Sequence, residues 1–434
     1  HPFTYYNEIQ ELTAASHYQF NFEGQQLHLS PYWEPQMTCD SNREPDDVLA
    51  KALSKAIKQA VDRRTYGRTG LLLSGGADSR ALLFSAAPPA SIDTVTFFDQ
   101  PNAELKVAQQ LAAEAGAKHT GWQRQFEHYG KAAHEVIELT NGMWSFKDIH
   151  YHGFHKQLAE QNWDTLLTGC YADYLLKGLA FNTQPKRILG RPTPLKKLSE
   201  YTPEFYQPHA DIDTSWQTLA YQRTSPDESQ LKDPSTLEDN RVRPLSREAD
   251  AMGRLYLQRT LPWDPVFLDN DILEIYQRLS PSQKLNSKVF RLAVHNIVRG
   301  AADHIPNNND GVALNASDTM RIIKHFQRRL SLKWAALREK LRNKKTKQSL
   351  ATSGSWPDFC HYVTNSDLVA DLWSSPQPEA QQLLTELLGY NPWSITLNTW
   401  GTPDRIDLFL RLLTLKIWAE KSIRFTIPSM ITAH

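Results

Sequence analysis

The sequence has few cysteines, no long apolar run and no excess of charge of either sign. Cys39, Cys170 and Cys360 are three isolated cysteines without metal-ligand spacing, so the sequence supports neither a disulfide framework nor a zinc site. No apolar stretch approaches the length of a membrane-spanning helix, and no signal-peptide pattern begins the chain. Lys plus Arg and Asp plus Glu both number 48, so net charge favours neither a nucleic-acid nor a membrane partner. We therefore expect a cytoplasmic protein, and 434 residues allow two domains.

The most informative segment is LLLSGGADSR, which begins at Leu71. Its apolar run is typical of a buried strand, and a helical pattern follows to about residue 86. Gly75 and Gly76 let the backbone turn sharply, so that its N–H groups and the start of the helix face one anion. Asp78 suits this setting if it holds Mg²⁺, which prefers oxygen ligands shared with a nucleotide. The alternative is a plain strand-to-helix turn in which Asp78 or Ser79 caps the helix.

Strands and helices alternate in the first half of the chain. Apolar strands are predicted at 71–73, 94–98 and 165–168, and helices at 46–64, 77–86 and 104–115. This alternation predicts an α/β fold with a parallel sheet and flanking helices. Ligands of such sheets bind at the carboxyl ends of the strands. The loop at Ser74 and the turn at Thr168-Gly169 should therefore share the edge where a nucleotide binds.

The remaining organisation is uneven. Alternating polar and apolar residues near the start predict a short hairpin, Pro-rich and charged segments predict an irregular insertion, and helical patterns dominate afterwards. The predicted parts are a lead-in over 1–45, an α/β core over 46–184, an irregular insertion over 185–246 and a mostly helical region over 247–434.

A basic segment lies in the helical region. Residues 320–348 carry eleven Lys or Arg, including Arg328 and Arg329, interleaved with apolar residues such as Phe326 and Trp334. One interpretation is a solvated helix face with an apolar stripe. The other is a surface for an anionic or lipid-linked substrate.

The loop resembles the pyrophosphate loop of the N-type ATP pyrophosphatases, and other segments extend this resemblance. In order along the chain they are similar to motifs of the asparagine synthetase family's synthetase domain, an ATP-dependent amide-forming ligase. The matching segments are the loop at 74–79, the helix at 102–112, Thr168–Asp173, Pro265–Asp269 and Ser287–Arg291. The opening residues 2–6 and 31–33 resemble the connector that follows a glutaminase domain in this family. Such a domain is expected to be missing here, because no cysteine precedes Cys39.

The resemblance implies a cofactor pair, ATP and Mg²⁺, and a set of site residues. Asp78 and Asp173 would hold the metal ion, while Leu72 and Phe98 would border adenine. ATP would activate a small-molecule carboxylate as an acyl-adenylate with loss of pyrophosphate, and ammonia, free or from a glutaminase domain or subunit, would form the amide. The residues that contact the phosphates would be Ser74, Gly75, Gly76 and Ser79, with Gly169 beside them.

Several family positions differ in this chain. Cys170 replaces the glutamate of the second motif, so Cys170 and its neighbour Tyr171 are the candidates for handling the amine. No cation lies at 306–310, where the family has a lysine, so another lysine must replace it. The candidates are Lys284, Lys288 and Lys324, of which we select Lys288. Asp264 stands where the family has an arginine.

These differences argue against free aspartate as the acceptor. The loop, the segment at 354–357 and the helix at 413–418 resemble a divergent branch associated with polysaccharide synthesis, which suggests amidation of a sugar acid. One alternative is a catalytically inactive nucleotide-binding protein. Others are a glutamine-hydrolysing asparagine synthase that lacks its glutaminase domain, and a sulfur-transfer or tRNA-modifying enzyme, although we expect no nucleic-acid partner.

Overall fold

The computed structural model describes residues 15–33, 38–142, 151–199, 212–218, 261–308, 310–342 and 357–422, together with residues 9, 12, 144, 145 and 147. The segments at 2–6 and 354–356, which contribute to the family resemblance, lie outside this part, as do residues 343–348 of the basic segment.

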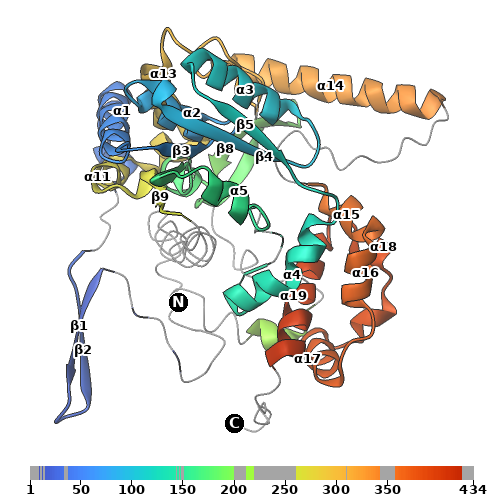
Figure 1. Cartoon of the computed structure of the whole chain (residues 1–434). Helices are drawn as coiled ribbons and strands as arrows, with labels where there is room; N and C mark the ends of the chain where they lie inside the picture. Colours follow the sequence, from blue (N-terminus) through green and yellow to red (C-terminus); the bar gives the residue numbers. More distant parts are fainter. Residues whose placement is uncertain are drawn as a thin grey trace.

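A five-stranded sheet forms the centre of the molecule (Figure 1). In spatial order its strands are β5 His119–Gln123, β4 Ile92–Phe98, β3 Thr69–Leu72, β6 Thr165–Thr168 and β9 Trp263–Pro265. All neighbouring pairs are parallel. The chain leaves β3 toward β4 on one side and later returns to place β6 on the other. The carboxyl ends of β3 and β6 therefore form a topological switch point, the usual place for a ligand in such sheets.

Local sequence explains the elements around this point. β3 and β6 are short and almost wholly buried, as expected where helices cover both faces of a parallel sheet. Helix α3 Ala103–Ala115 begins where the Asn102 side chain accepts a hydrogen bond from the Leu105 N–H, and it ends at Gly116 in the left-handed conformation.

Helices pack around the sheet. Helices α1, α2 and α13 lie against one another, and α3 contacts β4 and β5. The helices of this part besides α3 are α1 Asp46–Asp62, α2 Ala77–Ser85, α5 His155–Glu160, α6 Ala172–Leu176, α11 Asn270–Arg278, α12 Pro281–Lys284 and α13 Lys288–Val298.

A second group of helices surrounds helix α4 His128–Thr140, which packs against α16 and α19 (Figure 1). An aromatic cluster lies inside this group, where Trp373 stacks on Trp393 and meets Phe409 edge-on. The helices are α15 Phe359–Asn365, α16 Asp367–Trp373, α17 Pro378–Leu388, α18 Leu397–Trp400 and α19 Ile406–Ser422. The predicted fold class, a parallel α/β sheet followed by a mostly helical region, is confirmed.

Helix α14 Asp318–Arg342 stands apart from both groups and projects past them (Figure 1). Within the described part of the chain, no helix combines the length and apolar character needed to cross a bilayer.

The predicted hairpin near the start is present, with β1 Ser16–Asn21 paired antiparallel to β2 Gln26–Pro31. Two other boundaries differ from the prediction. The range predicted to be irregular begins with a second hairpin, β7 Thr183–Ile188 and β8 Arg191–Leu198, closed by Gly190 at a φ of 73°. The predicted 46–184 core is also incomplete, because its fifth strand, β9, comes from beyond the insertion.

Candidate functional site

The loop between β3 and α2 is held closed by its two serines. The Ser79 hydroxyl donates to the Ser74 carbonyl oxygen at 3.1 Å and accepts from the Ser74 N–H at 2.9 Å. The Ser74 hydroxyl in turn accepts from the Gly76 N–H at 3.2 Å. These bonds fix the loop at the positive end of α2, which favours an anion there.

Two glycines of the predicted site are required by close contacts. A Cβ on Gly75 would lie 2.6 Å from the Asn308 Cβ, and the Asn308 N–H donates to the Gly75 carbonyl at 3.1 Å. A Cβ on Gly169 would lie 2.8 Å from the Asp78 Cβ. The segment around residue 308 and the turn after β6 therefore both press against the loop.

Lys177 joins the two carboxylates that were predicted to hold a metal ion. Its Nζ donates to Asp78 Oδ2 at 2.5 Å and to Asp173 Oδ1 at 2.9 Å. The side chains of Lys177 and Asp78 are 14 % and 17 % exposed, whereas that of Asp173 is 60 % exposed. The Lys177 Nζ also lies 5.4 Å from the centre of the Phe290 ring, a favourable cation–π distance. The loop after β3 and the turn after β6 thus meet in one charged cluster.

Burial and charge set the protonation of this cluster. Burial raises the pKa of Asp78 to about 6, and the nearby Asp173 charge adds to this rise while Lys177 opposes it. Burial lowers the pKa of Lys177, but the charges and hydrogen bonds of Asp78 and Asp173 outweigh burial, so its pKa is raised. Lys177 is therefore charged at neutral pH.

The donor set fits a magnesium ion that is shared with a nucleotide. Asp78 Oδ1 is buried and has no hydrogen-bond partner, so it is ready to accept a ligand. Mg²⁺ is commonly held by one or two carboxylates together with substrate phosphates. In the described ranges, no group of three or more His, Cys, Asp or Glu side chains is arranged to hold a metal ion. Asp78 and Asp173 would therefore need phosphate oxygens to complete the coordination.

The residues predicted to border adenine lie at the same sheet edge. Leu72 and Phe98 end β3 and β4, and both are half-buried. The Phe98 ring lies close to Gly121 of β5, where an added Cβ would meet it at 3.1 Å. Behind Phe98, Phe97 packs edge-on against Trp122 in the core. Each of these strands thus ends in one half-buried apolar side chain at the carboxyl edge of the sheet.

Cys170 and Tyr171 take structural positions in the turn after β6. Tyr171 has a φ of 74°, precedes α6, and its side chain is buried in the core. Burial raises the pKa of the Cys170 thiol, although a hydrogen bond with Thr168 opposes the rise. Cys170 is therefore a neutral thiol where the family has a carboxylate.

The three lysines considered as replacements are placed differently from Lys177. Lys288 pairs with Asp46 in the first turn of α1 at 2.6 Å. Lys284 is buried with its Nζ 3.9 Å from the centre of the Tyr276 ring, and Lys324 is exposed on α14. The structure thus brings none of them into contact with Asp78.

Lys177 is not among the predicted site residues, although its spacing from Asp173 is a signal for it. Lys177 follows Asp173 by four residues, a spacing that places two side chains on one face of a helix. Its contact with Asp78, however, joins residues 99 positions apart.

Asp264, which replaces the family's arginine, has an arginine partner from another element. Arg64 Nε donates to Asp264 Oδ1 at 2.8 Å, and Arg64 Nη1 donates to Asp269 Oδ2 at 2.6 Å. Arg63 Nη2 donates to Asp269 Oδ1 at 2.6 Å. These ion pairs fasten the end of α1 to the segment that follows β9.

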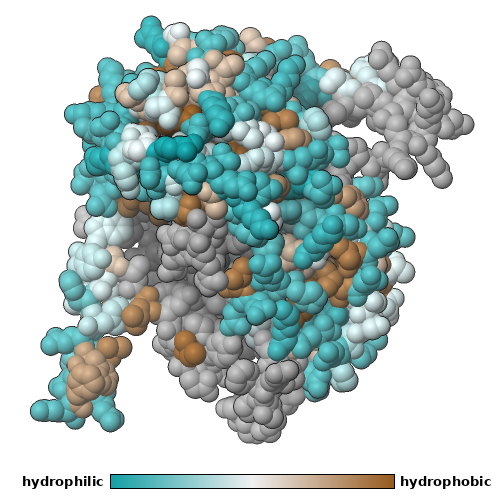
Figure 2. Space-filling model, in the orientation of Figure 1, coloured by the Kyte–Doolittle hydropathy of each residue, from teal (hydrophilic) through white to brown (hydrophobic). Residues whose placement is uncertain are grey.

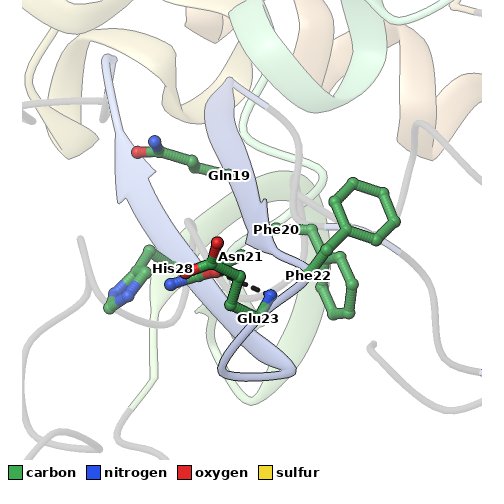
Figure 3. Close-up of a pocket in the computed structure, with 6 residues that line it drawn as sticks. All are labelled: Gln19, Phe20, Asn21, Phe22, Glu23 and His28. Atoms are coloured by element: carbon green, nitrogen blue, oxygen red, sulfur yellow. Dashed lines mark hydrogen bonds between the residues drawn. The ribbon is translucent and has the colours of Figure 1, made fainter.

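A shallow pocket occurs elsewhere, on the β1–β2 hairpin, and Figure 3 shows its six lining side chains. The hairpin also exposes Phe20, Phe22, Leu27 and Leu29, which give it the brown patch at the lower left of Figure 2. None of the lining residues belongs to the loop or to the charged cluster. The pocket therefore contributes nothing to the candidate site.

Residues 50–309 match the family model described as asparagine synthase, a span that covers more than half of the chain. The chain belongs to the asparagine synthase family. Membership of the asparagine synthase family supports an ATP-dependent ligase that forms amides from ammonia and a small-molecule substrate. It confirms the family resemblance of the sequence motifs. A comparison with curated proteins gives no match.

Among solved structures, one similar chain is the NH3-dependent NAD synthetase from Campylobacter jejuni subsp. jejuni NCTC 11168 in complex with the nitrate ion. The two sequences are 15 % identical, and the match covers 56 % of this chain and 93 % of that chain with a TM-score of 0.23. At this TM-score the likeness is too weak to support a conclusion about this chain.

Proposed function

We propose that this chain is an AMP-forming ligase that activates a carboxylate with Mg-ATP and joins it to ammonia. The observation that carries the proposal is the meeting of Asp78, Asp173 and Lys177 beside a closed loop at the switch point of the sheet. Asp78 and Asp173 would hold Mg²⁺. The residues proposed to contact the nucleotide are Leu72, Ser74, Gly75, Gly76, Ser79, Phe98 and Gly169.

The proposed reaction has two steps. A carboxylate oxygen of the acceptor attacks the α-phosphorus of ATP, and the bond from that phosphorus to the pyrophosphate oxygen breaks. Ammonia then attacks the carbonyl carbon, AMP leaves, and a proton from nitrogen passes to solvent. Bound Mg²⁺ would neutralise part of the charge on the phosphates. The chain's own contribution is mainly to position the phosphates and to present donors to the developing charge.

Lys177 is proposed as the cation that acts beside the phosphates. The family position for such a cation falls in 306–310, and the residues there are Pro, Asn and Asp. Lys177 is largely buried, charged and in direct contact with the carboxylate of the loop helix. Its contacts therefore favour Lys177 over Lys288, whose charge is engaged by Asp46.

The acceptor is proposed to be a sugar acid rather than free aspartate. Cys170 is a neutral thiol, so the charged group that handles the incoming amine in the family has no counterpart at this position. Tyr171 is buried in the core and does not replace that charge. An acceptor that brings its own charge, such as a hexuronic acid carried on a nucleotide or lipid phosphate, suits this site better.

Isotope exchange between pyrophosphate and ATP tests the proposal directly. Purified protein would be given Mg-ATP, labelled pyrophosphate and a panel of hexuronic acids, their nucleotide-linked forms and aspartate. We expect exchange that depends on a sugar acid, with AMP as the product once ammonia is added. ADP and phosphate as products would refute the AMP-forming chemistry. Binding of Mg-ATP without exchange for any acid would favour the inactive nucleotide-binding protein, and equal exchange with aspartate would refute the acceptor class.

A further inference from the structure

Helix α14 carries four large apolar side chains on one face that is open to solvent. Met320, Ile323, Leu330 and Trp334 are 46, 45, 56 and 62 % exposed. Because an α-helix has 3.6 residues per turn, the intervals between these four residues place them in one stripe along its length. Exposed apolar patches of this kind typically mark an interaction surface.

The same helix is strongly basic. Its 25 residues include eight Lys or Arg against two Asp or Glu, an excess of six positive charges. Lys324 and Arg328 are exposed and follow the stripe along one flank, and Arg329 is exposed on the other flank. The apolar stripe is therefore bordered by positive charge.

Contacts at its beginning orient the helix. Arg321 pairs with Asp310, and Arg291 from α13 approaches Asp318 at 3.5 Å. The helix also contacts β8. Beyond these contacts it projects past the sheet, so its stripe is open along most of its length (Figure 1).

We propose that α14 binds the surface of an anionic lipid bilayer and lies parallel to it. The apolar stripe would enter the boundary between headgroups and acyl chains, while Lys324 and Arg329 would meet anionic headgroups. Trp334 is the residue type enriched at that boundary. The inference is independent of the proposed ligase chemistry, because it uses no residue of the nucleotide site.

Charge and polarity argue against the other partners. A second copy of α14 would bring two helices with six excess positive charges each into contact, which is repulsive. A nucleic acid would match the charge but would leave aliphatic residues such as Ile323 and Leu330 without a favourable contact. A bilayer surface satisfies the charge and the stripe together.

Flotation of the full chain with vesicles tests the proposal. One set of vesicles is phosphatidylcholine alone, and the other contains about 30 % phosphatidylglycerol, which supplies the negative surface. We expect binding to the anionic vesicles only. Two variants should weaken this binding about 10-fold or more: Lys324→Gln/Arg328→Gln/Arg329→Gln and Ile323→Ser/Leu330→Ser. The matched control is Lys51→Gln/Lys55→Gln/Lys58→Gln, which removes three exposed charges from α1 and should bind as the wild type does.

Each variant is first shown to keep the wild-type Tm, so that lost binding is not lost folding. Quenching of the Trp334 signal by brominated lipid, measured as the difference from Trp334→Phe, should show that the stripe enters the bilayer. No binding to anionic vesicles, equal loss in the α1 control, or absence of Trp334 quenching would overturn the proposal. Stronger salt-dependent binding to RNA than to vesicles, or self-association lost in the stripe variant, would overturn it in favour of those partners.

Discussion

Lys177 gives the candidate site a resident positive charge before any ligand binds. It lies between a largely buried and an exposed carboxylate, Asp78 of α2 and Asp173 of α6, and it follows α6 directly. Removing one partner from a buried ion pair leaves an uncompensated charge, which costs more than the pair itself contributes. The lysine is therefore expected to support the folded state as well as the chemistry.

The first prediction concerns Lys177→Met, which removes the charge and keeps a long side chain. The nucleotide-free variant should lose about 3–5 kcal/mol of unfolding free energy, because the buried Asp78 carboxylate then has no counter-ion. Thermal unfolding without nucleotide measures this effect. Lys177→Arg is the control and should stay close to the wild type; a Met variant as stable as the wild type would refute the role of this ion pair in the folded state.

The second prediction concerns Asp78→Asn. Because it removes a charged oxygen ligand, we expect Mg-ATP affinity to fall at least about 10-fold, the loss seen even for outer-shell partners of metal sites. Titration calorimetry with ATP in the presence and absence of Mg²⁺ gives the affinity and its metal dependence. Asp62→Asn, on the exposed end of α1, is the matched control. Unchanged Mg-ATP affinity in Asp78→Asn would rule out this site.

At the scale of elements, Asp269 connects three parts of the chain. Its side chain is 8 % exposed, accepts from Arg63 and Arg64 at the end of α1, and caps α11 through the Asp271 N–H. Burial alone would raise the pKa of Asp269, but the hydrogen bonds from Arg63 and Arg64 outweigh burial and hold it below its usual value. The carboxylate thus stabilises the contact between α1 and the segment after β9.

The third prediction follows from this depressed pKa. Asp269→Asn keeps the cap but removes the charge, so it should cost about 1.5–3 kcal/mol at neutral pH, the contribution of a hydrogen bond to a charged group. A depressed folded pKa stabilises the protein above the unfolded pKa of about 3.9, and this contribution is lost as pH falls through the folded value. The difference between variant and wild type should therefore shrink with acidification. Urea unfolding at several pH values measures it, and Asp271→Asn, at a more exposed partner, should cost less; a pH-independent difference would contradict the assignment.

At the scale of the whole molecule, α4 belongs by sequence to the α/β half but packs with the C-terminal helices. Tyr362 of α15 makes this contact specific, because its buried hydroxyl accepts from the Gly130 N–H of α4 at 2.7 Å. Ser366 donates to Glu127, just before α4, at 2.6 Å. The α/β half of the sequence and the C-terminal helices are thus joined by one buried and one partly buried hydrogen bond as well as by apolar contact.

The fourth prediction is that Tyr362→Phe destabilises this junction by about 1–3 kcal/mol, the cost of leaving the buried Gly130 N–H without its acceptor. Unfolding should be followed by tryptophan fluorescence and by circular dichroism, and both probes should shift together if the halves unfold as one unit. Tyr66→Phe alters an exposed hydroxyl and should have no effect. A Tyr362→Phe variant as stable as the wild type would show that the hydrogen bond does not support the junction.

Local sequence was enough to predict the loop between β3 and α2, the parallel strands at 94–98 and 165–168 and the helical C-terminal region. Each of these depends on a local pattern: adjacent glycines after an apolar run, short buried runs, and helical periodicity. The closeness of Asp78 and Asp173 could also be predicted from the sequence, because the carboxyl ends of neighbouring parallel strands lie at one edge of the sheet. The β7–β8 hairpin was missed because prolines and charged residues obscure its alternation.

Which lysine contacts the two carboxylates, and which strand completes the sheet, became known only from the folded chain. Contacts between residues distant in sequence separate the two lysines, since Lys288 pairs with Asp46 and Lys177 pairs with Asp78. β9 is three residues long, too short to show a period, and it becomes a strand because the edge of β6 offers it hydrogen-bond partners. The pattern of a sequence specifies local conformation, but long-range pairing depends on which surfaces the folded chain brings together.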